Sequence, residues 1–348
     1  MQQWLKEVAS GKRGSKDLDY QQTKEVAQSI ISGKATDAQV AAYLIALRLK
    51  TESPEEMLAF VHAYQDVSNK LEVSNMSIID LASPYNGRNT FTGTIPTAIL
   101  MAEYGFPVFL HGSDSLPPKY GTALKEILLQ LGLNGSETPQ GLAKTIEEAG
   151  IAFANTEEYC SSLGKLRGIR KELGVRTLFN TVEKLLNLAN ANSLMMGAYH
   201  RTAINKIAPI FKELSFKNVY VVQGMEGSED LPVHRNSFIY KITDNKIESS
   251  IVKPEEFGLL VPELNKDVRL TVQEQSDITL AILSGEHSKS LQPYYNQVLF
   301  NTGIKYYLFG AVNDIGEGIE IAKQQLTEQR GLSQLEKWKV SQLENINY

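Results

Sequence analysis

The sequence of 348 residues contains a single cysteine, Cys160, so no disulfide can form within the chain. This excludes the small disulfide-stapled secreted domains and predicts a reducing compartment, the cytoplasm. No apolar stretch approaches the roughly 18 residues that a membrane-spanning helix requires. The first residues also lack the apolar core of a signal peptide, so no membrane contact is expected. The formal net charge of −5 gives no overall attraction to nucleic acid, which would need a local basic face.

The first 72 residues favour helices alone. Thr36 is followed three residues later by Gln39, and Ser53 by Glu56, which is the pattern of a helical capping box. Each of these pairs precedes apolar residues at helical spacing. We therefore expect a small all-helical domain over residues 1–72.

A homodimer through this helical domain is expected for a physical reason. Tyr43, Leu47 and Leu49 place apolar side chains on one predicted helix. A domain of about 70 residues has too little interior to bury all of them alone, and an apolar patch left on the surface is typical of an interface.

After residue 72 the pattern changes to an alternation of strands and helices, which predicts a larger α/β domain over residues 73–348 with a mostly parallel central sheet. The strand-like runs are 78–82, 106–110, 219–222 and 237–242, and the helical patterns are 94–104, 119–131, 139–149 and 200–214. Residues 313–345 also favour helices. A helical segment near residues 180–195 is expected to return to the small domain. The functional site is expected in the cleft between the two domains, beyond the carboxyl ends of the strands.

Two adjacent carboxylates, Glu229 and Asp230, follow the strand-like run 219–222 after a turn that contains glycine. Carboxylates in this place can hold Mg²⁺ beside a phosphate. The alternative is an acidic, solvent-exposed turn at the end of a strand.

A basic cluster lies in residues 165–176, where a single acid, Glu172, accompanies five cations. These are Lys165, Arg167, Arg170, Lys171 and Arg176. The cluster is either an anion-binding wall of the cleft or a solvated helix face. With Arg88, Lys12, Arg13 and Lys16 it is the feature that favours nucleic acid as a ligand.

Two shorter motifs are candidates for ligand contacts. Asn86, Gly87 and Arg88 form either a ligand loop, with Arg88 on an anion, or a simple turn. His111 and Gly112 follow a strand-like run and could bring backbone amides to a ligand, although a lone histidine is often structural.

Several separated motifs, in order along nearly the whole chain, carry a family resemblance. They are residues 42–50 with 53–56, residues 170–180, residues 221–227 and residues 301–310. Together they resemble the anthranilate phosphoribosyltransferase family, which shares its fold with pyrimidine nucleoside phosphorylases. The resemblance implies the two-domain fold, a homodimer, Mg²⁺, and a phosphorylated sugar in the cleft.

The same resemblance implies roles for individual residues. Thr90, His111 and Lys119 would line the phosphate side, Arg170 would meet the carboxylate of an aromatic acceptor, and Glu229 with Asp230 would hold the metal. The family's Gly-Thr-Gly-Gly-Asp-Gly loop, however, binds the diphosphate of phosphoribosyl diphosphate, and its positions here are Ala82, Ser83, Pro84, Tyr85, Asn86 and Gly87. Pro84 has no amide to donate and Tyr85 adds bulk where the ligand would lie.

Other departures fall at ligand positions. A lysine and an arginine of the family are replaced by Leu110 and Asp114, a histidine by Cys160, and a Gly-Pro pair by Glu183 and Lys184. Cys160 has no partner that would activate it and is expected to be buried and inert.

The string from Pro84 to Gly87 resembles a divergent branch typified by the YbiB protein, whose members keep the fold and the dimer and are associated with nucleic acid. Two functions follow from the sequence. One is a glycosyltransferase-family protein with an altered phosphoribosyl diphosphate site that is not a true anthranilate phosphoribosyltransferase. The other is a non-catalytic, nucleic-acid-binding homodimer that reuses the cleft. Steep weakening of binding by salt would indicate the second.

Overall fold

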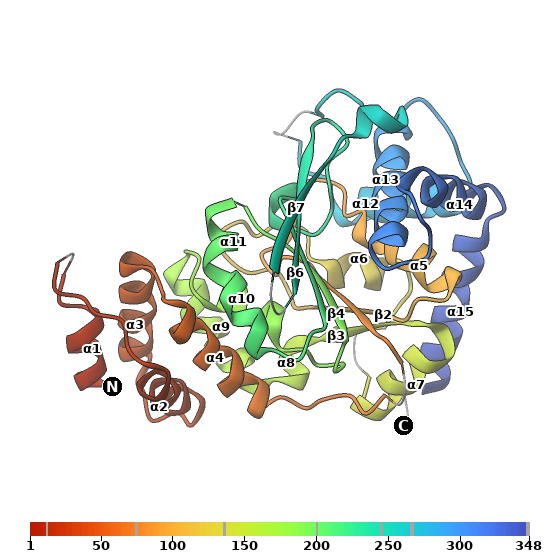
Figure 1. Cartoon of the computed structure of the whole chain (residues 1–348). Coiled ribbons are helices and arrows are strands. Elements are labelled where there is room, and N and C mark those ends of the chain that lie inside the picture. The colour runs from red at the N-terminus through yellow and green to blue at the C-terminus, as the bar shows by residue number, and fades with distance from the viewer. Residues whose placement is uncertain are drawn as a thin grey trace.

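The computed structural model describes residues 1–11, 13–73, 76–134, 137–199, 201–243, 246–264 and 268–345. It has a small helical part and a larger α/β part, side by side (Figure 1). The predicted fold class is therefore confirmed. The predicted domain boundary after residue 72 falls in the connection between the last N-terminal helix and the first strand, where Ser74 and Asn75 lie outside the described residues.

The helical part contains α1 (Gln2–Val8), α2 (Tyr20–Ile31), α3 (Asp37–Lys50) and α4 (Pro54–Asp66). Both predicted capping boxes form: the side chain of Thr36 accepts from the amide of Gln39, and that of Ser53 from the amide of Glu56. These bonds satisfy amides that have no partner inside the helix and so fix where α3 and α4 begin.

The apolar surface expected for a dimer is mostly absent. Tyr43 and Leu47 are fully buried within the chain, and only Leu49, at 79% exposure, faces solvent. The prediction assumed that the helical domain has a core of its own, but this core continues into the α/β part. Phe179, which follows the basic cluster, packs edge-on against Phe60 and Tyr64 of α4.

The segment expected near residues 180–195 does return to the helical part. It consists of α10 (Phe179–Val182) and the 3-10 turn η1 (Glu183–Leu185). Gln65 donates to the carbonyl of Leu185 at 2.7 Å. The segment is not helical beyond Leu185, because Asn187 and Asn190 adopt positive φ angles of 48° and a right-handed helix cannot continue through them.

In the described residues one seven-stranded sheet has the order β3-β2-β1-β4-β5-β6-β7, and its first five strands are parallel. The strands are β1 (Ile79–Ala82), β2 (Val108–Gly112), β3 (Ile151–Asn155), β4 (Ser193–Gly197), β5 (Asn218–Val222), β6 (Ser237–Thr243) and β7 (Lys246–Val252). The sequence did not predict β3, β4 or β7. The first two are short, with few β-branched residues, and β7 is an exposed antiparallel edge.

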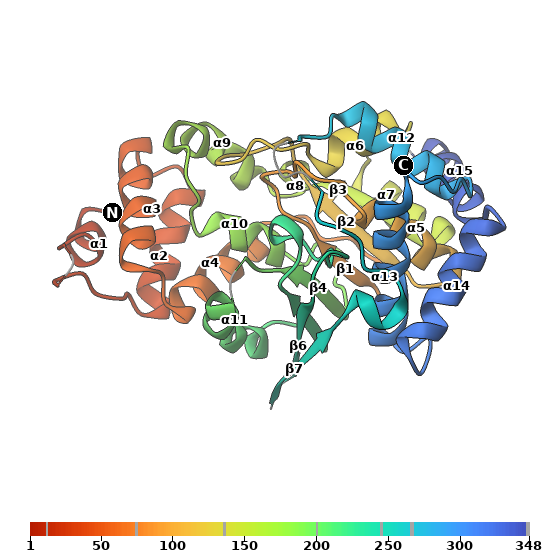
Figure 2. The same ribbon diagram turned by 90° about the horizontal axis from the view of Figure 1, so that it is seen from above.

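Helices cover both faces of the sheet (Figures 1 and 2). The remaining helical elements are α5 (Thr94–Tyr104), α6 (Leu124–Gln130), α7 (Pro139–Ala149), α8 (Thr156–Tyr159), α9 (Ser161–Leu173), α11 (Arg201–Ile207), η2 (Ala208–Glu213), η3 (Met225–Gly227), η4 (Pro254–Phe257), α12 (Val272–Leu283), α13 (Gln292–Leu308), α14 (Ile315–Thr327) and α15 (Arg330–Asn345). The helix expected at 119–131 begins only at Leu124. The helix expected at 200–214 begins at Arg201 and changes to 3-10 geometry at Ala208, and His200 lies outside the described residues.

Alternating side chains divide the core into two layers. On β5, Val219 and Val221 belong to the layer that continues into the helical part, whereas Tyr220 and Val222 belong to the layer under the C-terminal helices. This is the period of two that a strand imposes. The sheet is thus held from both sides, and the loops at the carboxyl ends of its strands are free to form a site. No helix among the described residues is long and apolar enough to cross a membrane.

Candidate functional site

Three loops meet beyond the carboxyl ends of β1, β2 and β5. Gly87 has a φ of 67°, and a Cβ placed there would lie 2.2 Å from the carbonyl oxygen of Gly121. Only glycine allows this close approach. It lets Arg88 and Thr122 exchange backbone hydrogen bonds of 2.9 and 2.8 Å, which fasten the loop after β1 to the loop after β2. Asn86 and Gly87 therefore form a turn whose neighbour, Arg88, is directed inward.

Each inward cation of the predicted site is paired with a carboxylate of the chain itself. Arg88 pairs with Asp230, and both side chains are almost fully buried. Lys119 pairs with Glu226. The predicted site residues are therefore close to one another, but in the described structure their charges are already balanced without a ligand.

Glu229 and Asp230 are fully buried, so the exposed acidic turn is excluded. Glu229 accepts from the hydroxyls of Ser83 at 3.0 Å and Thr94 at 2.5 Å. Asp230 accepts from the backbone amide of Thr94 at 3.0 Å and from Arg88.

This arrangement does not suit a resident Mg²⁺. The guanidinium of Arg88 occupies one side of Asp230, and a cation there repels a second one. Within the described residues no group of three or more His, Cys, Asp or Glu side chains is placed to hold a metal. The role of Glu229 and Asp230 as metal ligands remains a prediction.

Tyr85 and His111 form a buried chain of hydrogen bonds. His111 is hydrogen-bonded through Nε2 to Asp80 at 2.9 Å and through Nδ1 to the hydroxyl of Tyr85. That hydroxyl also lies 2.5 Å from the hydroxyl of Thr156. Burial raises the pKa of Tyr85 well above its usual value, so the hydroxyl stays protonated. Both nitrogens of His111 are engaged inside the protein, which favours the structural interpretation of this histidine and of Gly112 beside it.

The basic cluster of residues 165–176 is divided among different environments. Arg167 is bound to Glu157 at 2.6 Å, and Lys165 and Lys171 are exposed. Arg176 stacks on the ring of Tyr199, 4.4 Å from its centroid. The cluster is therefore neither a single wall nor a single solvated face.

Arg170 is the buried member of this cluster, and it pairs with Glu183 at 2.6 Å. Burial raises the pKa of Glu183 in spite of the neighbouring guanidinium. Glu183 stands where the family has glycine. The sequence shows this replacement, but it does not show that Glu183 contacts Arg170.

A cavity of about 470 Å³ lies between the helical part and the carboxyl ends of the strands. Its lining includes three cations, Arg48, Arg176 and Lys184, and one acid, Glu52. Lys184 donates to the carbonyl of Gly227 at 3.1 Å. Burial, assisted by the charge of Arg176, lowers the pKa of Lys184 to about 8.

The cations of this cavity were only partly foreseen. Arg48 belongs to α3, and its Nη1 donates to the carbonyl of Arg176 at 2.7 Å, so the helical part contributes directly to the cavity. Arg176 was a predicted site residue, whereas Lys184 was noted only as a departure from the family. No local signal marked Arg48, because its role depends on how the two parts pack.

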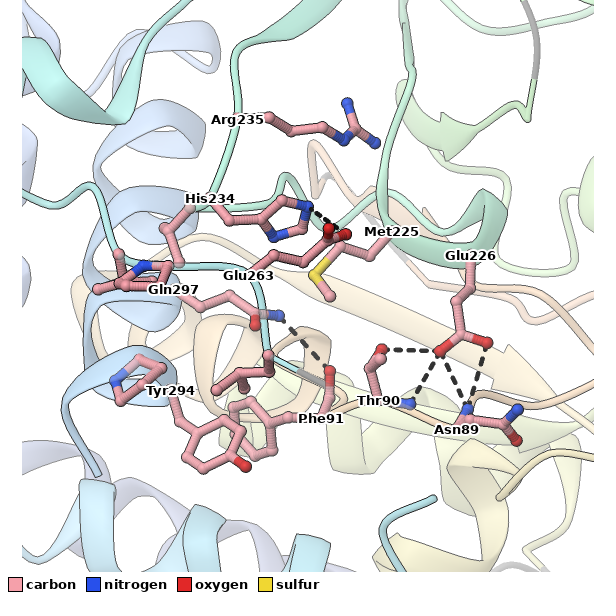
Figure 3. A pocket seen from close by; sticks show the side chains of 15 residues that line it. Asn89, Thr90, Phe91, Met225, Glu226, His234, Arg235, Glu263, Tyr294 and Gln297 are labelled. Atoms are coloured by element: carbon pink, nitrogen blue, oxygen red, sulfur yellow. Dashed lines mark hydrogen bonds and ion pairs between the residues drawn. The ribbon is translucent and has the colours of Figure 1, made fainter. Parts of the chain in front are cut away.

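A second cavity, of about 350 Å³, adjoins the loop after β1 (Figure 3). Phe91 and Tyr294 meet edge to face in its wall, with ring centroids 5.2 Å apart. Thr90 and Glu226 lie at one edge. Its lining comes from five separate segments, so only Thr90 among these residues was a predicted site residue.

Cys160 is fully buried and free, and burial raises the pKa of its thiol, in accordance with the inert role expected for it.

The fold is a helical bundle beside an α/β part, with a cavity between them. The helical bundle domain of a glycosyl transferase family matches residues 2–68, and the a/b domain of that family matches residues 85–331. The chain belongs to this family, and its similar proteins place it in the anthranilate phosphoribosyltransferase superfamily.

An anthranilate phosphoribosyltransferase of Desulfitobacterium hafniense (strain Y51) is 31% identical over 325 residues, which are 93% of this chain and 95% of that one. One of Thermoanaerobacter sp. (strain X514) is 29% identical over 323 residues, which are 92% and 93% of the two chains. These relatives are similar over both domains.

Solved structures agree with this fold. Anthranilate phosphoribosyltransferase from Thermus thermophilus has a TM-score of 0.83 at 23% identity, covering 99% of this chain and 100% of that one. The Saccharomyces cerevisiae enzyme in complex with PRPP and Mg has a TM-score of 0.83 at 21% identity, covering 99% and 98%.

Proposed function

We propose that this protein is an anthranilate phosphoribosyltransferase-like member of its family with an altered phosphoribosyl diphosphate site, and that it is not a true anthranilate phosphoribosyltransferase. One observation carries the proposal. Arg88, Lys119 and Arg170, which the sequence predicts to meet a ligand, each pair with a carboxylate of the chain.

The energetic consequence is large compared with an ordinary substrate affinity. Breaking a buried pair by removing one partner costs about 3–5 kcal/mol, whereas a micromolar dissociation constant corresponds to about 8 kcal/mol. A diphosphate that had to separate the buried pair of Arg88 and Asp230 would lose a large part of its binding free energy. Pro84 offers no amide in compensation, and Tyr85 is held in place by His111.

What remains suited to an anion is the interdomain cavity with Arg48, Arg176 and Lys184. We infer that a phosphorylated sugar or another anion binds there, with Arg176 as its principal contact. Mg²⁺ would enter with such a ligand, and Glu229 and Asp230 would reach it only after Arg88 had moved. In a phosphoribosyl transfer the protein supplies positioning and charge stabilisation, so displaced cations would mean slow chemistry.

A second candidate is a non-catalytic, nucleic-acid-binding homodimer. The observation that favours it is that Arg176, shortly after the end of α9, lines the interdomain cavity, while Lys165 and Lys171 are exposed on α9 itself. Arg13 and Lys16 are exposed on the helical part, and Lys12 lies outside the described residues. The divergent YbiB-like branch, the homodimer through the helical domain and the cytoplasmic location remain predictions.

Calorimetry tests the proposal. We expect PRPP with Mg²⁺ to bind weakly or not at all, and anthranilate not to be converted. A micromolar dissociation constant that is lost with a chelator, together with turnover of anthranilate, would refute the altered site.

An oligonucleotide titration at two salt concentrations separates the two candidates. Binding that weakens steeply with salt, and that weakens further in Arg176→Ala, supports the nucleic-acid function. The matched control is Arg235→Ala, which removes a cation from the second cavity instead. Salt-independent binding, or equal losses in the two variants, contradicts a backbone-binding site at Arg176.

A further inference from the structure

The carboxylate of Glu226 lies in a cradle made only of hydrogen-bond donors (Figure 3). It accepts from the backbone amides of Asn89 at 3.0 Å and Thr90 at 2.8 Å, and from the hydroxyl of Thr90 at 2.7 Å. Lys119 completes the set. Two successive amides aimed at one point, with a hydroxyl and an ammonium beside them, form an anion-binding nest. The nest would accept a phosphate oxygen as readily as a carboxylate.

The backbone of Glu226 is held in a disfavoured conformation. Its φ of 52° and ψ of 24° lie in the left-handed region, which residues with a Cβ rarely adopt. Such a conformation persists only where surrounding contacts hold it. Here the side chain's own contacts with the cradle do so. If another anion takes these contacts, the segment η3 can relax.

The surroundings allow an exchange of this kind. The side chains of Glu226 and Lys119 are each 18% exposed, so solvent reaches the cradle. The cavity of about 350 Å³ adjoins it and offers space both for the displaced side chain and for a ligand. The rings of Phe91 and Tyr294 in its wall suit a flat or apolar body.

We propose that Asn89, Thr90 and Lys119 form a phosphate-binding cradle that Glu226 closes from within, and that its ligand is a phosphate monoester of a ring compound whose ring lies on Phe91 and Tyr294. The phosphate displaces the Glu226 carboxylate, and Glu226 is an intramolecular competitor of the ligand. This inference rests on the proposed function, because it concerns the phosphate side of the same altered site.

The competitor is a permanent anion. Burial alone would raise the pKa of Glu226, but the hydrogen bond from Lys119 and the charges of Arg88 and Lys119 outweigh it and lower the pKa to about 2. Ligand concentration, and not pH in the physiological range, therefore decides which anion occupies the cradle.

The experiment uses the full-length protein and two probes, inorganic phosphate and phenyl phosphate, in calorimetric titrations. Glu226→Ala empties the cradle and Glu226→Gln keeps its shape without the charge. We expect both variants to bind inorganic phosphate at least tenfold more tightly than the unaltered protein, and phenyl phosphate more tightly still. Glu263→Gln is the matched control, because it removes a carboxylate from the opposite wall of the same cavity, and it should give no gain.

Combining each Glu226 substitution with Lys119→Met should abolish the gain, and combining it with Tyr294→Ala should remove the preference for phenyl phosphate. Unchanged phosphate affinity in both Glu226 variants would overturn the cradle, as would a gain that survives loss of Lys119 or one that Glu263→Gln reproduces. Equal affinity for the two probes would overturn the ring-bearing ligand. Thermal melting with and without phosphate provides a second measurement, in which only the Glu226 variants should be stabilised.

Failure here is distinguishable from failure of the proposed function. The latter is decided by PRPP binding and anthranilate turnover in the unaltered protein, whereas the cradle is decided by the difference in phosphate affinity between the Glu226 variants and the unaltered protein.

Discussion

The substitution Arg170→Met should destabilise the protein far more than its place in an exposed-looking basic cluster indicates. The side chain of Arg170 is 4% exposed and that of its partner Glu183 1%. Removing the guanidinium leaves the Glu183 carboxylate in the interior without its ion-pair partner. Such a loss costs about 3–5 kcal/mol of unfolding free energy.

The loss should depend on pH in a definite direction. The pKa of Glu183 is already raised by burial in the presence of Arg170, and removing Arg170 raises it further. A carboxyl with a raised folded pKa binds more protons when folded than when unfolded. The loss of unfolding free energy caused by Arg170→Met is therefore smallest below the pKa of Glu183 in the unfolded chain. It grows as pH rises through the pKa of Glu183 in the folded protein. Arg170→Met should lose more stability at pH 8 than at pH 5.

Urea unfolding at these two pH values measures the effect. Lys171→Met is the matched control, because its side chain is exposed on the same helix, and it should change the unfolding free energy by less than about 0.5 kcal/mol. Adding Glu183→Gln to Arg170→Met should recover much of the loss by removing the buried charge. Equal effects of the two single substitutions, or no recovery in the double variant, would refute the reasoning.

Three further predictions follow from the same structure. Tyr85→Phe should cost about 1–3 kcal/mol of unfolding free energy in urea titrations, because it leaves the buried Nδ1 of His111 without its hydrogen-bond partner; an unchanged midpoint would contradict the buried chain. Affinity for an anion in the interdomain cavity should fall between pH 7 and 9 as Lys184, with a pKa of about 8, loses its charge, and Lys184→Met should remove this step; a step that persists excludes Lys184. A homodimer is still expected from the family resemblance, although Tyr43 and Leu47 are buried within the chain, and sedimentation as a monomer at micromolar concentration would contradict it.

The fold was predictable because local signals and the core agree. Capping residues fixed the starts of α3 and α4, and the β-branched run of β5 identified a central strand. Two strands had too weak a sequence signal to be predicted. The sequence of β4, Ser-Leu-Met-Met-Gly, has no β-branched residue, and β7 is a polar edge strand. Their positions follow from pairing with neighbouring strands, which a single sequence does not display.

The sequence indicated which residues of the candidate site would lie close together, but not which side chains they would contact. Gly87, Thr90 and Lys119 do lie near one another. The carboxylates that pair with the two cations of this region, however, come from a loop more than a hundred residues away in the sequence. Lys119 pairs with Glu226, and Arg88 pairs with Asp230. Which carboxylate neutralises which cation is decided by how loops from different strands meet, and no local pattern encodes that.

Under the proposed function, two internal carboxylates would separate the retained fold from the activity of the relatives. The resemblance places Arg170 opposite the carboxylate of an acceptor, and Glu183 supplies that carboxylate from within the chain. Glu226 does the same for the amides of Asn89 and Thr90. A site that already contains its counter-ions is stable when empty, so a ligand gains only the difference between its own contacts and those it displaces. Loss of the usual affinity is then compatible with full retention of the fold, because the pairs that weaken binding also neutralise charges that the empty cleft would otherwise leave buried.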